Sequence, residues 1–238
     1  MIKRIDQFLL RKLNIGRLLL YPTAVFLVSL ITLYGGYQYM EAASTSTFTQ
    51  VISASTLATD IRSDSTTSVS SPAVSLSSQT FSFNCQTSTG TFGTNGERIY
   101  VDNPDGADNG WTLTVAASPA ATAVWNQGSN YFDFNDAGGS GCTDGADADS
   151  YGGQLTINAN AGTITTDYSG SDTTGLTKGT STAFAQGTTD SITLITAANT
   201  SADIWRGYIT GISLSQTIPA EQAAASYTIN FALTATAS

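Results

Sequence analysis

Hydrophobic residues alternate with small or polar residues in many short segments between Thr80 and the C-terminus. The clearest case is the last segment, in which Tyr227, Ile229, Phe231 and Leu233 occupy every second position. The same alternation recurs upstream at 81–85, 111–115, 155–157, 192–194 and 212–218. A period of two places one set of side chains on a buried face of a sheet and the other set in water. The pattern therefore predicts a series of half-buried β-strands.

Turn-forming residues separate these segments. Gly, Asn, Asp and Pro cluster at 103–106, 109–110, 138–139 and 152–153, and no long stretch of this region has a helical period. Short strands at regular spacing, divided by turns, are typical of sandwiches and barrels. We therefore expect residues 80–238 to form an all-β domain, an Ig-like or Greek-key β-sandwich or a jelly roll of about 8–12 strands.

A different pattern occupies the N-terminus, where residues 18–40 form an uncharged run between Arg17 and Glu41. About 20 apolar residues are enough to cross a bilayer. Most of the basic residues precede the run, so this side should stay in the cytoplasm and the remainder should be exported. We expect one hydrophobic helix that inserts in the membrane at least during export, and an extracellular or cell-surface location for the rest.

The fate of this helix has two alternatives. The small residues Ala42, Ala43 and Ser44 follow the run and offer a cleavage site. Tyr residues near the end of the run suit the membrane interface of a retained anchor instead. Residues 1–43 are thus predicted to be a signal peptide or a membrane anchor.

Residues 44–79 are rich in Ser and Thr, with scattered apolar residues. This composition predicts an N-terminal strand followed by a spacer. A strand near Phe48 to Ile52 would belong either to the sheet of its own chain or to a sheet edge of a neighbouring copy.

The charge of the exported part restricts the partners that it can bind. After Glu41 the chain has four basic residues against sixteen acidic ones, a formal charge of −12. A surface this acidic repels nucleic acid, so we expect no DNA or RNA partner.

The two cysteines, Cys85 and Cys142, are expected to form a disulfide in an oxidising compartment outside the cell. The alternative is a pair of buried thiols.

Chemistry-bearing residues are scarce. The chain has no histidine, which excludes His-based triads and general bases, and the few basic residues give no phosphate clamp. Acidic residues are plentiful enough for a glycosidase pair, but no spacing selects one. We therefore expect a protein that is not an enzyme.

An acidic, glycine-rich segment is the strongest candidate for a metal site, because Ca²⁺ prefers oxygen ligands from carboxylates, amides and carbonyls. The spacing partly matches a calcium loop, without flanking helices. The alternative is an acidic turn whose Asp side chains cap the backbone. The predicted calcium ligands are Asp133, Asn135, Asp136, Asp144, Asp147 and Asp149.

Three tryptophans are candidates for stacking on sugar rings. Trp111 shares the alternation of Leu113 and Val115, which predicts core packing. Trp125 and Trp205 lie near turns and are the candidate glycan contacts.

Two segments carry a resemblance to a known family. Gly110-Trp111-Thr112-Leu113-Thr114-Val115 resembles the first signature of the WxL surface domains of bacteria. Ile218-Pro219-Ala220 and Ser226–Leu233 resemble the second signature, with Phe231 where that family carries Trp. The resemblance implies a β-rich protein associated with peptidoglycan. Segments 141–149 and 211–217 also resemble uncharacterised exported proteins of candidate-phyla bacteria.

These observations together predict an exported cell-surface protein with a structural or adhesive role, with self-assembly and a stabilising calcium ion as further expectations. The alternative function is a WxL-type module that binds peptidoglycan or another cell-wall glycan.

Overall fold

The computed structural model describes residues 25–30, 49–50, 55–104, 109–145, 149–201 and 204–238 of the chain. The chain divides into two compact units, Met1–Val51 and Ile52–Ser238. In the first unit residues 25–30 are helical, whereas the remainder of the predicted membrane segment lies outside the described residues. No helix within the described ranges has the length and apolar character needed to cross a membrane.

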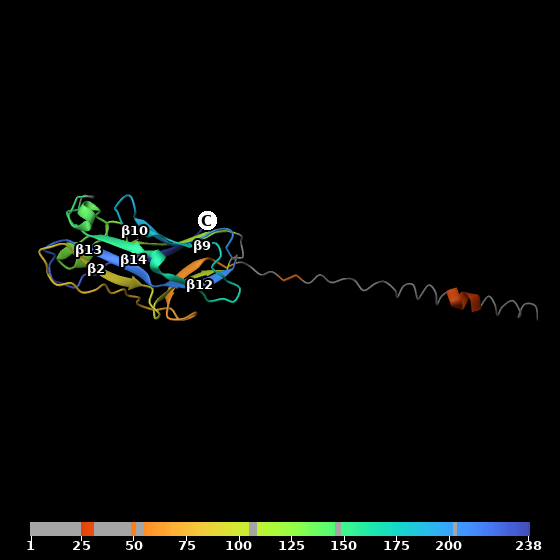
Figure 1. The fold of residues 1–238 in the computed structure, drawn as a ribbon. Helices are drawn as coiled ribbons and strands as arrows, with labels where there is room; N and C mark the ends of the chain where they lie inside the picture. The colour runs from red at the N-terminus through yellow and green to blue at the C-terminus, as the bar shows by residue number, and fades with distance from the viewer. Residues whose placement is uncertain (1–24, 31–48, 51–54, 105–108, 146–148, 202–203) are drawn as a thin grey trace, which may run out of the picture. The chain divides into compact units, whose positions relative to one another are not determined.

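The second unit is built from strands (Figure 1). Ten of its fourteen strands in the described residues are longer than three residues. These ten are β1 (Ala58–Arg62), β2 (Gln86–Phe92), β3 (Arg98–Asn103), β4 (Trp111–Ser118), β7 (Gln154–Asn158), β8 (Thr163–Thr166), β11 (Ser191–Ala197), β12 (Trp205–Thr210), β13 (Ile212–Ile218) and β14 (Asn230–Ala237).

Four strands have only three residues, and two short 3₁₀ helices lie in the connections. The short elements are β5 (Trp125–Gln127), β6 (Asn130–Phe132), β9 (Leu176–Lys178), β10 (Ser181–Ala183), η1 (Gly138–Gly141) and η2 (Ala159–Ala161).

All strand pairs are antiparallel and form three four-stranded sheets and one ribbon. The first sheet has the order β1-β3-β12-β8, the second β10-β7-β13-β2, and the third β14-β4-β11-β9. β5 and β6 form the separate ribbon. The prediction of an all-β sandwich is therefore confirmed, with fourteen strands in the described residues in place of the expected 8–12.

The first and second sheets join end to end as one layer. Only Gly211 separates β12 from β13, and its φ of 77° is a left-handed conformation that favours glycine. The Gly211 N–H donates to the Gly93 carbonyl oxygen at 2.8 Å, between β2 and β3. Pairs β2–β3, β12–β13 and β7–β8 thus each run from one sheet into the next. The third sheet faces this layer across the core.

Most of the core comes from the alternation that the sequence displays. The alternation at 81–85 is an exception, because this segment forms no strand and Phe81 and Phe83 are exposed. Along β4 buried positions alternate with half-buried ones, beginning with Trp111 and Leu113. The rings of Trp111 in the third sheet and Trp205 in the first lie 5.2 Å apart, so they join the two layers at one end of the sandwich.

The segment predicted as an N-terminal strand and spacer contributes β1 to the first sheet. β1 pairs with β3 over five residues, from Ala58 opposite Asp102 to Arg62 opposite Arg98. The compact unit accordingly begins before residue 80, at Ile52. Phe48 and residues 51–54 lie outside the described residues.

Candidate functional site

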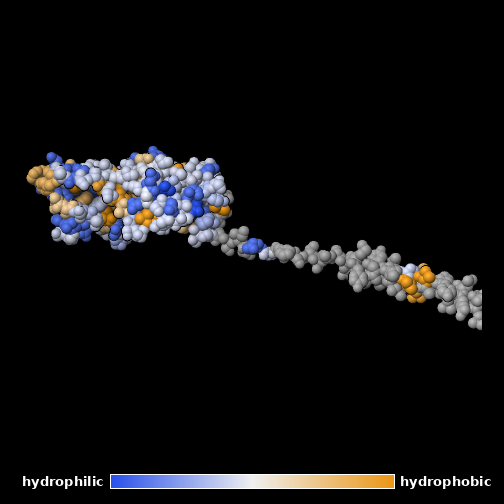
Figure 2. Space-filling model, turned by 90° about the horizontal axis from the view of Figure 1, so that it is seen from below, coloured by the Kyte–Doolittle hydropathy of each residue, from blue (hydrophilic) through white to orange (hydrophobic). Residues whose placement is uncertain are grey.

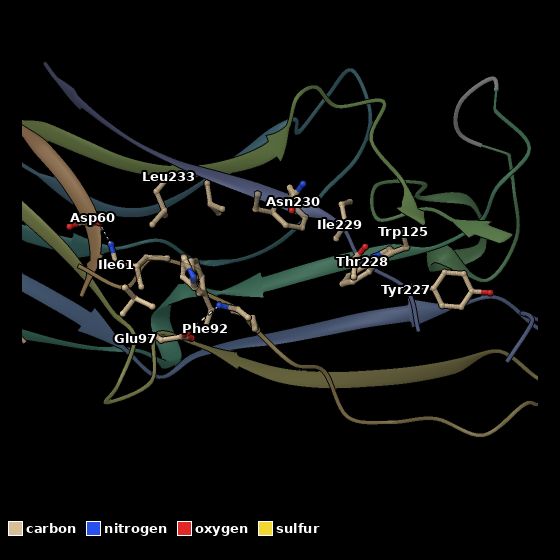
Figure 3. A pocket seen from close by; sticks show the side chains of 16 residues that line it. Asp60, Ile61, Phe92, Glu97, Trp125, Tyr227, Thr228, Ile229, Asn230 and Leu233 are labelled. Carbon is tan, nitrogen blue, oxygen red and sulfur yellow. Dashed lines mark hydrogen bonds between the residues drawn. The ribbon is translucent and has the colours of Figure 1, made fainter. Parts of the chain in front are cut away.

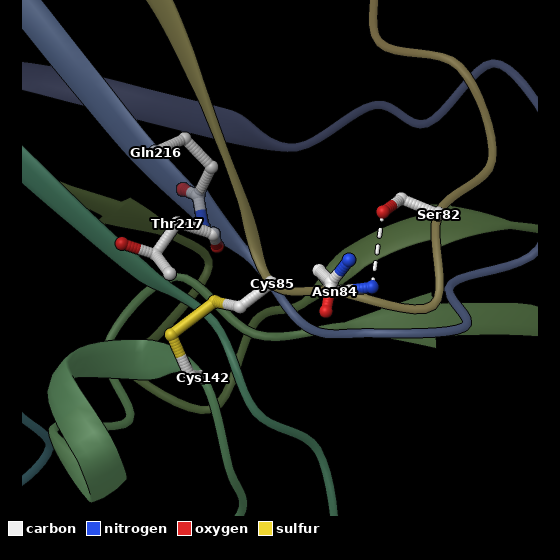
Figure 4. The surroundings of a disulfide bond; sticks show 6 residues. All are labelled: Ser82, Asn84, Cys85, Cys142, Gln216 and Thr217. Atoms are coloured by element: carbon white, nitrogen blue, oxygen red, sulfur yellow. Dashed lines mark hydrogen bonds between the residues drawn. A yellow bond between two sulfur atoms is a disulfide. The ribbon is translucent and has the colours of Figure 1, made fainter.

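The predicted disulfide between Cys85 and Cys142 is present (Figure 4). Cys85 immediately precedes β2, and Cys142 follows η1, so the bond ties the acidic segment to the second sheet. The two Cα atoms lie 5.6 Å apart, within the ordinary range for a disulfide. The bond fixes one end of the sandwich.

The first half of the predicted calcium segment is buried. Asp133, Asn135 and Asp136 are each at most 1 % exposed. The Asp136 carboxylate accepts hydrogen bonds from the N–H groups of Gly138 at 2.6 Å and Gly145 at 3.0 Å. Its two oxygens therefore fix the loop by accepting backbone hydrogen bonds.

The side chains of Asp133 and Asn135 also form hydrogen bonds with the backbone. Asp133 Oδ1 accepts from the Phe134 N–H, and the Asn135 amide donates to the Ala121 carbonyl oxygen at 2.8 Å. These contacts fit the alternative interpretation, in which Asp and Asn side chains organise a turn.

The second half of the segment does not gather around these buried residues. Asp144 is exposed, Asp149 Oδ1 accepts from the Tyr151 N–H at 2.8 Å, and Asp147 lies outside the described residues. Among the residues that the structure describes, no group of three or more acidic, Cys or His side chains could hold a metal ion. The calcium site stays a prediction of the sequence.

Trp205 must be removed from the candidate sugar contacts. Its side chain is 1 % exposed, and its indole N–H donates to the Asp172 carbonyl oxygen at 2.8 Å. The ring packs on Trp111 in the core, so no sugar can reach it. The turn signals next to Trp205 suggested exposure, but the residue begins a strand whose first side chain points inward.

Trp125 is half-buried and lies at the side of the sandwich. Its indole N–H donates to Gln216 Oε1 at 2.9 Å, and its ring stacks on Phe132 with a centroid distance of 5.6 Å. The Phe132 ring meets the Tyr227 ring edge-on at 5.0 Å. Trp125 thus belongs to a small aromatic cluster with an accessible face.

This cluster lies at one end of a groove of about 510 Å³, which we call the side groove (Figure 3). One wall comes from β1 and the 69–74 segment, and the other from residues 227–233. In Figure 3, Leu233 and Ile229 lie across the groove from Ile61 and Phe92. The lining also includes Val115, a fully buried residue of β4, so the groove opens onto the core.

The lining of the side groove is mainly apolar and carries two acidic residues, Asp60 and Glu97, without a basic one. A second cavity of about 510 Å³ continues past Trp125 between segments 73–81 and 222–228. Polar surface dominates the sandwich, but apolar patches appear at one end and along the side in Figure 2. Such a concave apolar surface is suited to binding a chain segment or a ring-containing ligand.

The groove wall formed by β14 is a sheet edge, because β14 pairs only with β4 among the described strands. The Ser238 N–H donates to the Gly110 carbonyl oxygen at 2.8 Å. In an antiparallel ladder the residues that exchange hydrogen bonds alternate with those that do not. Phe231 and Leu233 are out of phase with Ser238, so their N–H and C=O groups point away from β4.

The β14 edge lacks the features that usually protect an edge strand. It has eight residues and contains no charged residue, glycine or proline. The side chains of Phe231 and Leu233 are only partly buried, although they face the core. An edge of this length and composition is a template for another strand.

The other long edges are protected. β1 carries Asp60 and Arg62, and the bordering strands β9 and β10 have three residues each. The β2 edge is covered, because the Ser77 N–H donates to the Thr89 carbonyl oxygen at 2.7 Å. β8, the remaining edge strand, has four residues. Among the described edges β14 is therefore the longest uncharged one, although β1 lies close to part of it.

A charge network holds β1 beside the groove. Arg62 contacts the carboxylates of Asp60 at 3.0 Å and Asp102 at 2.7 Å, and Arg206 contacts Asp102 at 3.2 Å. Burial raises the pKa of Asp60, but hydrogen bonds from Ser68, Arg62 and the Ile61 N–H outweigh burial and lower this pKa below its usual value. Asp60 therefore favours its charged form in the folded state.

Comparison with known proteins gives no match among protein-family models, curated proteins or solved structures. Of the segments that resemble the WxL signatures, residues 111–115 lie in β4 and residues 230–233 in β14, which pairs with β4, whereas Ile218 ends β13 in the second sheet. Phe231 lies opposite Ala117 in this pairing, and Ala237 lies opposite Trp111.

Proposed function

We propose that this chain is an exported structural or adhesive protein of the cell surface, which associates with further copies through the β14 edge. The observation that carries the proposal is the uncharged, unpaired edge of β14 beside an apolar groove. Main-chain hydrogen bonds from an added strand provide affinity, and burial of Phe231 and Leu233 adds the hydrophobic contribution.

Two features of the sequence and fold support an extracellular role. The disulfide between Cys85 and Cys142 suits an oxidising compartment. The hydrophobic run at residues 18–40, with basic residues before it, is typical of export.

The test uses two lysine substitutions one residue apart. Leu233→Lys places a charge in the side groove, whereas Thr234→Lys places the same charge on the outer, exposed face of β14. The full chain, expressed with its own leader, would be purified and examined by light scattering and electron microscopy. We expect assembly for the wild type and for Thr234→Lys and its loss for Leu233→Lys. Equal assembly by both variants would refute the β14 edge as the contact.

A second candidate function, glycan binding, is favoured by the half-buried rings of Trp125 and Tyr227, which line the side groove on either side of the buried Phe132. Aromatic rings in an open groove suit stacking on sugar rings. Retention on purified peptidoglycan that falls in Trp125→Phe, but not in the buried control Trp205→Phe, would support this function. No retention of the wild type would exclude it.

A further inference from the structure

The side groove lies where one further strand of the third sheet would lie, next to β14. Its lining reaches Val115 in the core, and its β14 wall presents outward main-chain groups at Phe231 and Leu233. A single extended chain placed there would complete the third sheet and cover the partly buried side chains. A whole second sandwich is a poorer fit, because the wall of residues 69–74 stands opposite β14.

The charges around the groove restrict the occupant. No basic residue lines the groove; Asp60 is paired with Arg62, so Glu97 is the carboxylate that would repel an acidic segment. An uncharged segment of strand-forming residues meets both requirements, the electrostatic one and the one for main-chain pairing.

This chain contains such a segment just before β1. From Ala42 to Thr59 no residue is charged, and Phe48, Val51 and Ile52 are strand-forming residues. The C-terminus is not available for this purpose, because β14 itself extends to Ala237 and pairs with β4. Leu57 packs against the core of its own sandwich, and Ser55 and Thr56 lie beside β3 and β12. The candidate occupant of another copy's groove is therefore the stretch before residue 55.

The length of the segment is also sufficient. Residues 44–54 span up to about 36 Å when extended, at roughly 3.3 Å per residue. Pairing alongside residues 229–233 needs about five residues, or roughly 17 Å. The segment is therefore longer than the pairing requires.

From these observations we infer that the side groove receives the uncharged segment 44–54 of a second copy, which adds as a strand to β14. This inference rests on the proposed function and names the partner at the same edge. Each copy would offer a segment at one site and a groove at another, so the contact is heterologous and repeats from copy to copy.

The test combines two defective chains. One carries the deletion of residues 44–54 and keeps the groove; the other carries Leu233→Lys and keeps the segment. Each would be made as a full chain with its own leader and with a different affinity tag. We expect neither chain to assemble alone, and a one-to-one dimer to form when they are mixed. Thermal unfolding of each chain alone checks that both are folded.

Two results would overturn the inference in different ways. Assembly of the deletion variant by itself, together with loss of assembly in Leu233→Lys, would keep the β14 edge as the contact but exclude the segment as its occupant. A wild-type chain that stays monomeric would overturn the proposed function as well.

Cross-linking tests the position of the segment directly. With cysteine substituted at Phe48 and at Thr228, we expect a disulfide cross-link between differently tagged copies. A cross-link confined to single copies would place the segment in its own groove and refute the inference.

Discussion

Asp60 and its partners show how single side chains secure the border of the side groove. Asp60 lies in β1, contacts Arg62 within the same strand and accepts a hydrogen bond from Ser68. Arg62 in turn reaches Asp102 on β3, so the network crosses the strand pair. Partly exposed ion pairs of this kind each contribute little, but a connected set fixes the geometry of an edge strand.

The pKa of Asp60 leads to a prediction about acid. Because this pKa is lower in the folded than in the unfolded chain, the carboxylate stabilises the fold above about pH 4, and this contribution disappears as pH falls through the folded value. We expect Asp60→Asn to lower the free energy of unfolding at pH 6 by less than about 1 kcal/mol, and the difference from wild type to shrink at pH 3. Urea unfolding at both pH values measures this, and a difference independent of pH would contradict it.

At the scale of elements, the link between β2 and the acidic segment is the most consequential. The disulfide joins residues 57 positions apart, and Asp136 holds the same loop through Gly138 and Gly145. Without the bond, the loop would depend on these hydrogen bonds and on its contacts with β7.

Removal of the disulfide should therefore destabilise the sandwich. We expect the double variant Cys85→Ser with Cys142→Ser to lose roughly 4 kcal/mol of unfolding free energy, because closing a loop of this length restricts the unfolded chain by about this amount. Denaturant unfolding of the variant and of reduced wild type should agree with each other. An unchanged midpoint in either sample would show that the bond carries no stability.

The sequence predicts an element well when a local pattern of residues determines that element, and poorly when distant partners determine it. The period of two in β4 and β14 is a local property, and both strands were foreseen together with the sandwich class and the disulfide. The four three-residue strands are too short to show a period, and the role of β1 depends on its partner β3. The side groove was missed because it is formed by the meeting of two layers.

The candidate site residues show the same limit. Acidic residues within a short segment suggested a metal site, but sequence spacing does not reveal that backbone N–H groups occupy the oxygens of Asp136. Trp125 and Trp205 looked alike in the sequence. Their alternation with neighbouring residues is too short to show which ring points inward, and only the fold separates the half-buried Trp125 from the buried Trp205.

At the scale of the whole molecule, charge opposes association while the β14 edge favours it. The chain has a formal charge of −9, and Glu97 places one of its carboxylates at the contact, while Asp60 is paired with Arg62. Copies that approach one another therefore repel, and added salt weakens this repulsion because the screening length falls from about 30 Å at 0.01 M to about 10 Å at 0.1 M.

This balance predicts the sign of the salt effect on assembly. If an added strand and apolar burial provide the contact, the protein concentration needed for assembly should fall as NaCl rises from about 0.01 to 0.1 M, since only the repulsive part is screened. Light scattering across this range measures the onset, and Leu233→Lys should remain unassembled throughout. A contact made of ion pairs would behave in the opposite way, so an onset that moves to higher protein concentration with salt would exclude the β14 edge as the main source of affinity.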